Sequence, residues 1–136
     1  MAGSLVSPLP YKFNTPSGHT LLKTIVSQRV PYTPHDYQLD GVSWLLDGTD
    51  LVAVLATGSG KTGFYLFYIL ALLELSADPS LCQPPYKPVP RDLCIVVVYP
   101  TNGLEEEQVR NCAPFDCTFL LTWLSLCRHL CLRRQG

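Results

Sequence analysis

The feature that most constrains this chain is a glycine-containing loop between two apolar segments. Residues 57–62 read Thr-Gly-Ser-Gly-Lys-Thr; a short apolar run at 51–55 precedes them, and an apolar segment at 63–75 follows. Small residues let successive backbone N–H groups converge on one anion at the positive end of a helix. The loop therefore predicts a site for a polyphosphate, which we expect to be ATP bound together with Mg²⁺.

Each residue type in the loop has a chemical role in this prediction. Gly58 and Gly60 would allow the backbone to approach the phosphates, Lys61 would place its ammonium against the β and γ phosphates, and the Thr62 hydroxyl would coordinate Mg²⁺. The alternative is a Gly-Ser turn that precedes Lys-Thr by chance, and the flanking strand and helix patterns favour nucleotide binding. The predicted ATP-binding residues of the loop are Thr57, Gly58, Ser59, Gly60, Lys61 and Thr62.

The apolar patterns around the loop predict an α/β fold. Helical spacing predicts a helix over residues 34–46, and an unbroken apolar run predicts a buried strand over 51–55. A second helix is expected over 63–75, and five prolines between 79 and 90 predict an irregular surface loop. The β-branched run at 93–99 predicts another strand. Together these elements predict a parallel sheet with flanking helices.

Three segments then occur in the order that superfamily 2 helicases share. Residues 55–62 resemble the first motif of that superfamily, which tolerates Leu55 where the usual loop has a glycine. Residues 32–38 are similar to the segment in which DEAD-box and RecQ-like helicases place a glutamine that reads adenine. Residues 98–109 resemble the next motif of RecQ-like enzymes. The resemblance implies a partial RecA-like P-loop lobe over residues 32–109.

The resemblance also implies roles for residues outside the loop. Gln38 would hydrogen-bond the adenine, with an ordinary exposed helical glutamine as the alternative. His35 departs from the arginine that RecQ-like proteins tend to carry there. A contact with the nucleic acid backbone is implied for the segment after the second strand, where a strand-ending turn is the alternative. Its residues are Pro100, Thr101, Asn102, Gly103 and Leu104.

The implied activity is that of an ATP-dependent, RecQ-like 3'-5' DNA helicase. The partner would be nucleic acid, with DNA favoured over RNA, and the protein would be intracellular and nuclear. Hydrolysis in this family needs an acidic pair on a later strand, and none follows Val109, where Asp116 stands alone. We therefore expect a fragment with no complete catalytic set, which binds ATP and nucleic acid but hydrolyses ATP poorly. A stand-alone nucleotide-binding or interaction module is the alternative, and a P-loop kinase is a more distant one.

The two ends of the chain carry weaker predictions. Residues 1–31 are expected to be a poorly ordered leader with one or two helical turns. The apolar tail at 110–136 has three interpretations: an amphipathic helix that covers the sheet, a membrane-surface helix, or a non-native end from a truncated or misread gene product.

Composition sets outer limits on these predictions. With 136 residues the chain has room for one domain and not for a two-lobed motor. A net charge of −1 means that any nucleic acid must bind a local surface. The six cysteines include no CxxC pair, which favours free thiols over a metal site at Cys127, His129 and Cys131. No apolar stretch is long enough to span a membrane.

Overall fold

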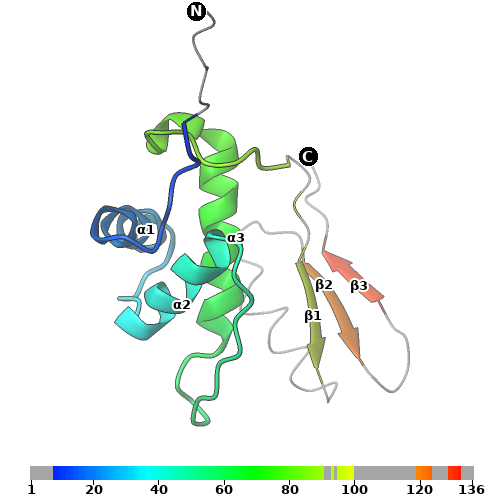
Figure 1. Cartoon of the computed structure of the whole chain (residues 1–136). Coiled ribbons are helices and arrows are strands. Elements are labelled where there is room, and N and C mark those ends of the chain that lie inside the picture. The colour runs from blue at the N-terminus through cyan, green and yellow to red at the C-terminus, as the bar shows by residue number, and fades with distance from the viewer. Residues whose placement is uncertain (1–7, 91–92, 94, 100–118, 124–128, 133–136) are drawn as a thin grey trace, which may run out of the picture.

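The computed structural model describes residues 8–90, 93, 95–99, 119–123 and 129–132. Three helices make up most of this part: α1 (Pro16–Arg29), α2 (Asp36–Leu46) and α3 (Thr62–Ala77). A 3₁₀ turn, η1 (Pro79–Leu81), follows α3. The strands are β1 (Ile95–Tyr99), β2 (Phe119–Trp123) and β3 (His129–Leu132). Figure 1 shows α1 and α2 on one side of α3 and the strands on the other.

Helix α3 is the centre of the packing. It is apolar around most of its circumference, and Phe67, Leu70 and Ala71 are fully buried in it. Helix α1 packs on it through Leu22 and Val26, and α2 contributes a further set of buried side chains. Burial of each large apolar side chain is worth about 1.5–3 kcal/mol, so α3 holds the helical layer together. The helices predicted over 34–46 and 63–75 are confirmed.

The first helix corrects the prediction for residues 1–31. We expected one or two helical turns, whereas α1 runs for 14 residues and buries Leu22, Ile25 and Val26. Its start is well defined, because the Thr15 hydroxyl accepts a hydrogen bond from the Gly18 N–H (3.0 Å) and proline occupies the first turn. Because polar residues separate its apolar positions, the sequence pattern did not predict a helix of this length.

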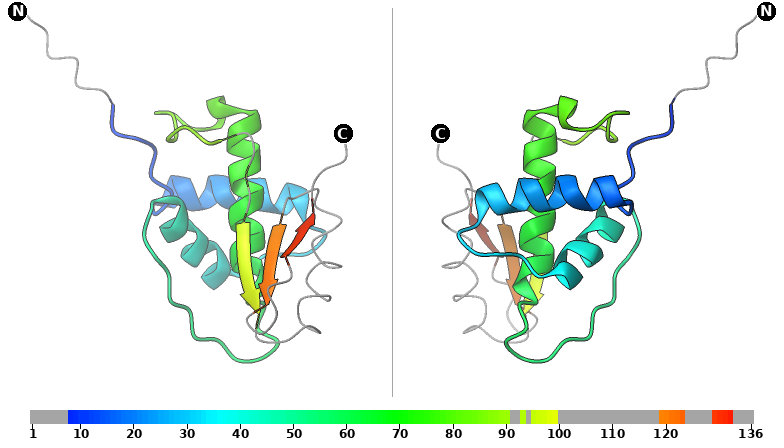
Figure 2. Two further views of the ribbon diagram at one scale, coloured as in Figure 1. Left: turned by 90° about the vertical axis from the view of Figure 1, so that its right-hand side faces the viewer. Right: turned by 90° about the vertical axis from the view of Figure 1, so that its left-hand side faces the viewer.

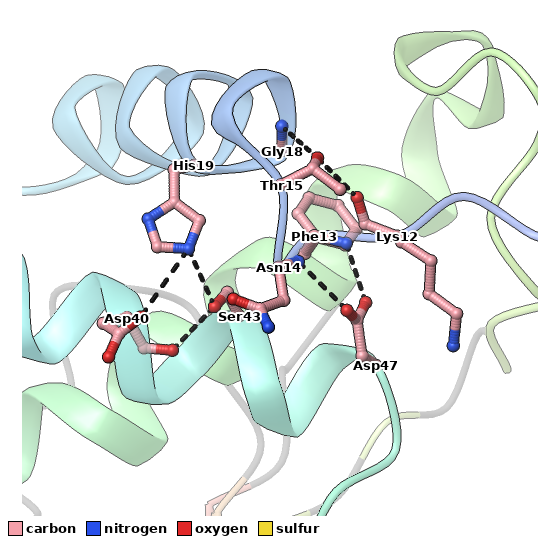
Figure 3. A network of polar contacts seen from close by, with 9 residues as sticks. All are labelled: Lys12, Phe13, Asn14, Thr15, Gly18, His19, Asp40, Ser43 and Asp47. Carbon is pink, nitrogen blue, oxygen red and sulfur yellow. Dashed lines mark hydrogen bonds and ion pairs between the residues drawn. The ribbon is translucent and has the colours of Figure 1, made fainter.

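The segment before α1 is tied to the end of α2 by one carboxylate. Asp47 accepts hydrogen bonds from the Phe13 N–H (2.7 Å) and from the Asn14 N–H (3.0 Å), as Figure 3 shows. Phe13 is fully buried beside the ring of Tyr86, at a centroid distance of 5.5 Å. The Tyr86 hydroxyl donates to the Leu46 carbonyl, and burial raises the pKa of that phenol. Asp47 thus fixes the chain where three segments meet.

A second polar contact joins α1 to α2 and is structural. The Ser43 hydroxyl lies 3.1 Å from His19 Nε2 and donates to the Asp40 carbonyl at 2.6 Å. The Asp40 carboxylate lies 3.8 Å from the same ring nitrogen (Figure 3). A catalytic triad needs the acid on the other ring nitrogen and a serine whose proton is free for the histidine. This group therefore lacks nucleophile geometry and serves to join the two helices.

The strand predicted over 51–55 does not form, which corrects the parallel sheet predicted from the segments at 51–55 and 93–99. The segment is extended coil, and Val52 and Val54 are 91% and 93% exposed. An apolar run becomes a strand only when another backbone pairs with it. No strand pairs with residues 51–55 in the described part of the chain.

The strand predicted over 93–99 is confirmed as β1 in a three-stranded sheet. β1 pairs with β2 in parallel, and β2 pairs with β3 in antiparallel orientation. Figure 2 shows these strands in front of α3 when seen from their side. Because β2 and β3 lie in the tail, both helical interpretations of residues 110–136 are wrong over those strands. The non-native interpretation of the tail stays a prediction.

The proline-rich connection is irregular as predicted. Residues 82–90 contain no helix or strand, and the Gln83–Pro84 peptide bond is cis. Cys82 at its start is a fully buried free thiol, and burial raises its pKa. The predicted free thiol is confirmed at this cysteine.

Replacing Asp47 by asparagine tests the tie between α2 and the chain before α1. Asparagine keeps the shape but presents an N–H₂ group to one of the two backbone donors, which leaves that donor unpaired. We expect the free energy of unfolding to fall by about 2 kcal/mol, measured by urea denaturation. Asp50→Asn is the matched control, because Asp50 is exposed in the coil that follows α2. Equal stability of both variants and the parent would contradict the role assigned to Asp47.

Candidate nucleotide-binding site

The predicted phosphate loop forms a tight turn directly before α3. The Ser59 N–H and hydroxyl both donate to the Ala56 carbonyl, the former at 3.2 Å. Gly58 and Gly60 have φ angles of +80° and +79°, in the left-handed region that favours glycine. The two glycines are therefore required by the backbone path of the loop.

The end of the loop presents backbone donors at the start of α3. Lys61 is the residue that precedes the first helical position, and Thr62 opens the helix. Within the described part of the chain, no acceptor lies against the N–H groups of Gly60, Lys61 or Thr62. The helix dipole adds a partial positive charge at this end. The arrangement suits an anion, and the exposed Lys61 adds a full charge beside it.

Gln38 reaches this loop from α2. Its side-chain amide donates to the Gly60 carbonyl (2.7 Å), and its side-chain carbonyl accepts from the His35 N–H (2.9 Å). Gln38 is only 4% exposed, and a methyl group on either Gly60 or Gly63 would collide with its amide nitrogen. The structure thus brings Gln38 into contact with the loop, and its predicted adenine contact stays a prediction.

Tyr37 is a contact that sequence reasoning missed. Its hydroxyl donates to the Ser59 carbonyl, one residue before the carbonyl that Gln38 binds. One feature of the sequence could have indicated this contact: Tyr37 directly precedes Gln38. Two adjacent residues in the first turn of a helix can bind two adjacent carbonyls of the same loop.

A cavity of about 510 Å³ lies between the coil before the loop, α3 and β1. Leu51, Ala53 and Leu55 line it from the coil, and Phe64 and Ile95 line it from α3 and β1. Its remaining lining residues are Leu45, Gly48, Thr49, Asp50, Lys61, Tyr65, Tyr68 and Lys87. The alternate residues Val52 and Val54 face outward, so the coil already has the two-residue side-chain period of a strand.

The structure describes the predicted ATP-binding residues but not the predicted nucleic-acid contacts. The loop residues and Gln38 come together, although 22 positions separate Gln38 from Gly60. The predicted nucleic-acid contacts, residues 100–104, lie outside the described residues. Thr62 lies at the first position of α3, and its predicted coordination of Mg²⁺ stays a prediction. In the part of the chain that the structure describes, no cluster of three His, Cys, Asp or Glu side chains could hold a metal on its own.

Comparison with known families identifies the chain's relatives. The model of the family described as DEAD/DEAH box helicase matches residues 35–126. The chain belongs to the DEAD/DEAH box helicase family. The match begins just before α2 and includes the loop, so the helicase family predicted from the motifs is confirmed. Membership in this family implies the use of ATP.

Two curated proteins are similar to this DEAD/DEAH box chain. The "Probable ATP-dependent RNA helicase ddx3" of Dictyostelium discoideum is 35% identical over 107 residues, which cover 76% of this chain and 15% of that protein. The "ATP-dependent RNA helicase DBP2" of Scheffersomyces stipitis is 34% identical over 96 residues, which cover 70% of this chain and 16% of that protein. The matches therefore span about a sixth of the length of these relatives. No solved structure matches the chain.

These relatives do not support the finer part of the family prediction. Both carry names of RNA helicases, and neither is RecQ-like, so the predicted RecQ-like subfamily and the preference for DNA find no support. Among the described residues of the DEAD/DEAH box chain, no helix is both long and apolar enough to cross a membrane.

Replacing Gly63 by alanine tests the packing between Gln38 and the loop. The new methyl group would lie 2.3 Å from the Gln38 amide nitrogen, so Gln38 must move and release the Gly60 carbonyl. We expect a loss of about 1–2 kcal/mol in the free energy of unfolding, since a buried amide loses its partner.

The same substitution in a Gln38→Ala background is the matched control. There the clash with Gln38 is absent and only a 3.0 Å approach to the buried Phe67 ring remains, while alanine favours the helix over glycine, so Gly63→Ala should cost less than it does in the parent. The same loss in both backgrounds would contradict the contact.

Proposed function

We propose that residues 57–62 bind the phosphates of a Mg²⁺–nucleotide, and that this chain is the ATP-binding part of an ATP-dependent RNA helicase. The observation that carries the proposal is the set of N–H groups of Gly60, Lys61 and Thr62, which have no acceptor in the described part of the chain and open at the start of α3. Unpaired backbone donors at a helix start are a ready site for a polyphosphate.

The roles of the loop residues follow from their positions. The Lys61 ammonium would neutralise the terminal phosphates, and the Thr62 hydroxyl would coordinate Mg²⁺. Thr57, Gly58 and Ser59 would surround the phosphates with backbone. When bound, Mg²⁺ supplies charge neutralisation across the phosphate oxygens.

Gln38 contributes to the same site. It contacts the loop on the side away from the open N–H groups, and we propose that it also reads the adenine edge. Its amide carries two N–H donors, so one can hold the Gly60 carbonyl while the other reaches the base.

RNA replaces DNA as the proposed nucleic acid. The support is the names of the two relatives, both RNA helicases that share 34–35% identity with this chain. We propose that residues 100–104 contact the sugar-phosphate backbone, as their resemblance to a helicase motif implies. The parallel pairing of β1 with β2 is compatible with a RecA-like sheet, which we propose as the architecture of the longer family domain.

A binding measurement tests the proposal. We expect a fluorescent ATP analogue to bind the chain in the presence of Mg²⁺, and Lys61→Ala to weaken binding at least tenfold, because a charge-assisted hydrogen bond contributes about 1.5–3 kcal/mol. Chelation of Mg²⁺ should weaken binding as well.

Lys23→Ala is the matched control for charge. Lys23 is an exposed lysine on α1, far along the chain from the loop, and its loss changes the net charge by the same amount. Equal affinity of the parent and the Lys61→Ala protein would overturn the proposal.

A further inference from the structure

Tyr37 lies in the first turn of α2, and its hydroxyl reaches the phosphate loop. Its ring is held on two sides: it stacks on His35 with a centroid distance of 5.2 Å and an interplanar angle of 10°, and it lies 6.4 Å from the Phe64 ring. Phe64 itself packs on α2 where Gly41 leaves room, since a methyl group at Gly41 would collide with that ring. The Tyr37 side chain therefore has a defined orientation although it is partly exposed.

The orientation of a peptide unit explains why this contact matters. In a trans peptide the carbonyl and the following N–H point in opposite directions. The only cis bond in the described part of the chain is Gln83–Pro84, so the peptide units after Ser59 and Gly60 are trans. Tyr37 holds the Ser59 carbonyl and Gln38 holds the Gly60 carbonyl, both from α2. The N–H groups of Gly60 and Lys61 must then point away from α2.

The glycine that allows phosphates to approach also weakens the loop. Gly60 tolerates positive and negative φ about equally, so the Ser59–Gly60 peptide unit can flip at little cost if nothing holds it. A flipped unit would present the Ser59 carbonyl, in place of the Gly60 N–H, to the phosphates. The Tyr37 hydroxyl opposes this flip, because flipping breaks its hydrogen bond to that carbonyl.

We propose that Tyr37 is a positioning residue for phosphate binding, which holds the Ser59–Gly60 peptide with the Gly60 N–H toward the anion. This inference rests on the proposed function of the loop and adds a residue that the motif resemblance does not assign. The contact acts on the phosphates through the backbone, and the base plays no part in it.

The test compares Tyr37→Phe with the parent and with Tyr11→Phe. The first variant removes only the hydroxyl that holds the loop, and the second removes a hydroxyl near Phe13, away from the loop. Affinity for inorganic triphosphate with Mg²⁺ is measured by its displacement of the fluorescent ATP analogue, and stability is measured by thermal unfolding. We expect Tyr37→Phe to bind triphosphate about fivefold more weakly, the equivalent of one hydrogen bond of about 1 kcal/mol. Its melting temperature should fall by no more than about 5 °C, the shift expected for the loss of one such hydrogen bond, and Tyr11→Phe should bind like the parent.

Hydrogen exchange separates positioning from a general loss of structure. The Gly60 amide should exchange at a changed rate in Tyr37→Phe, while the amides of α1 and α3 keep their parent rates. Unchanged triphosphate affinity would overturn the inference, as would a weakening matched by a general loss of stability. If the parent itself fails to bind triphosphate or the ATP analogue, the proposed function fails. If Lys61→Ala loses binding and Tyr37→Phe does not, only the role of Tyr37 fails.

Discussion

The packing of α3 against α1 and α2 is the constraint on which the site depends. Its buried side chains fix the helix axis, and the axis fixes where the first turn at Thr62 and Gly63 emerges. The loop before it is exposed and has few contacts of its own. A rigid helix start is what gives the open N–H groups of the loop a constant direction.

Helix α2 adds the second point of support. Its first turn provides Tyr37 and Gln38, which hold two successive carbonyls of the loop. Its last turn ends at Asp47, which fixes the chain before α1. One short helix thus joins the phosphate loop to the packing of the helical layer, and this accounts for the buried position of a polar side chain such as Gln38.

The sequence predicted the helical part of the site well and the sheet poorly. Helices α2 and α3 follow directly from apolar spacing. Motif order assigned Gln38 to the same site as the loop, but its hydrogen bond to the Gly60 carbonyl was not predicted. Local pattern identified residues 51–55 as a strand, but a strand needs a partner backbone, and pattern carries no information on partners. Helix α1 was underestimated because its apolar positions are separated by threonine, lysine and serine. Tyr37 was missed because its role depends on its hydroxyl meeting a carbonyl 22 residues away.

The central claim is that the backbone N–H groups of Gly60, Lys61 and Thr62 bind a polyphosphate, and amide chemical shifts test it most directly. In a ¹⁵N-labelled sample titrated with Mg²⁺ and inorganic triphosphate, the account predicts large, saturable shifts for the amides of Gly60, Lys61 and Thr62. The amides of α1 should stay unchanged in the same titration. Shifts spread evenly over the chain, or none at the loop while the protein stays folded, would contradict the account.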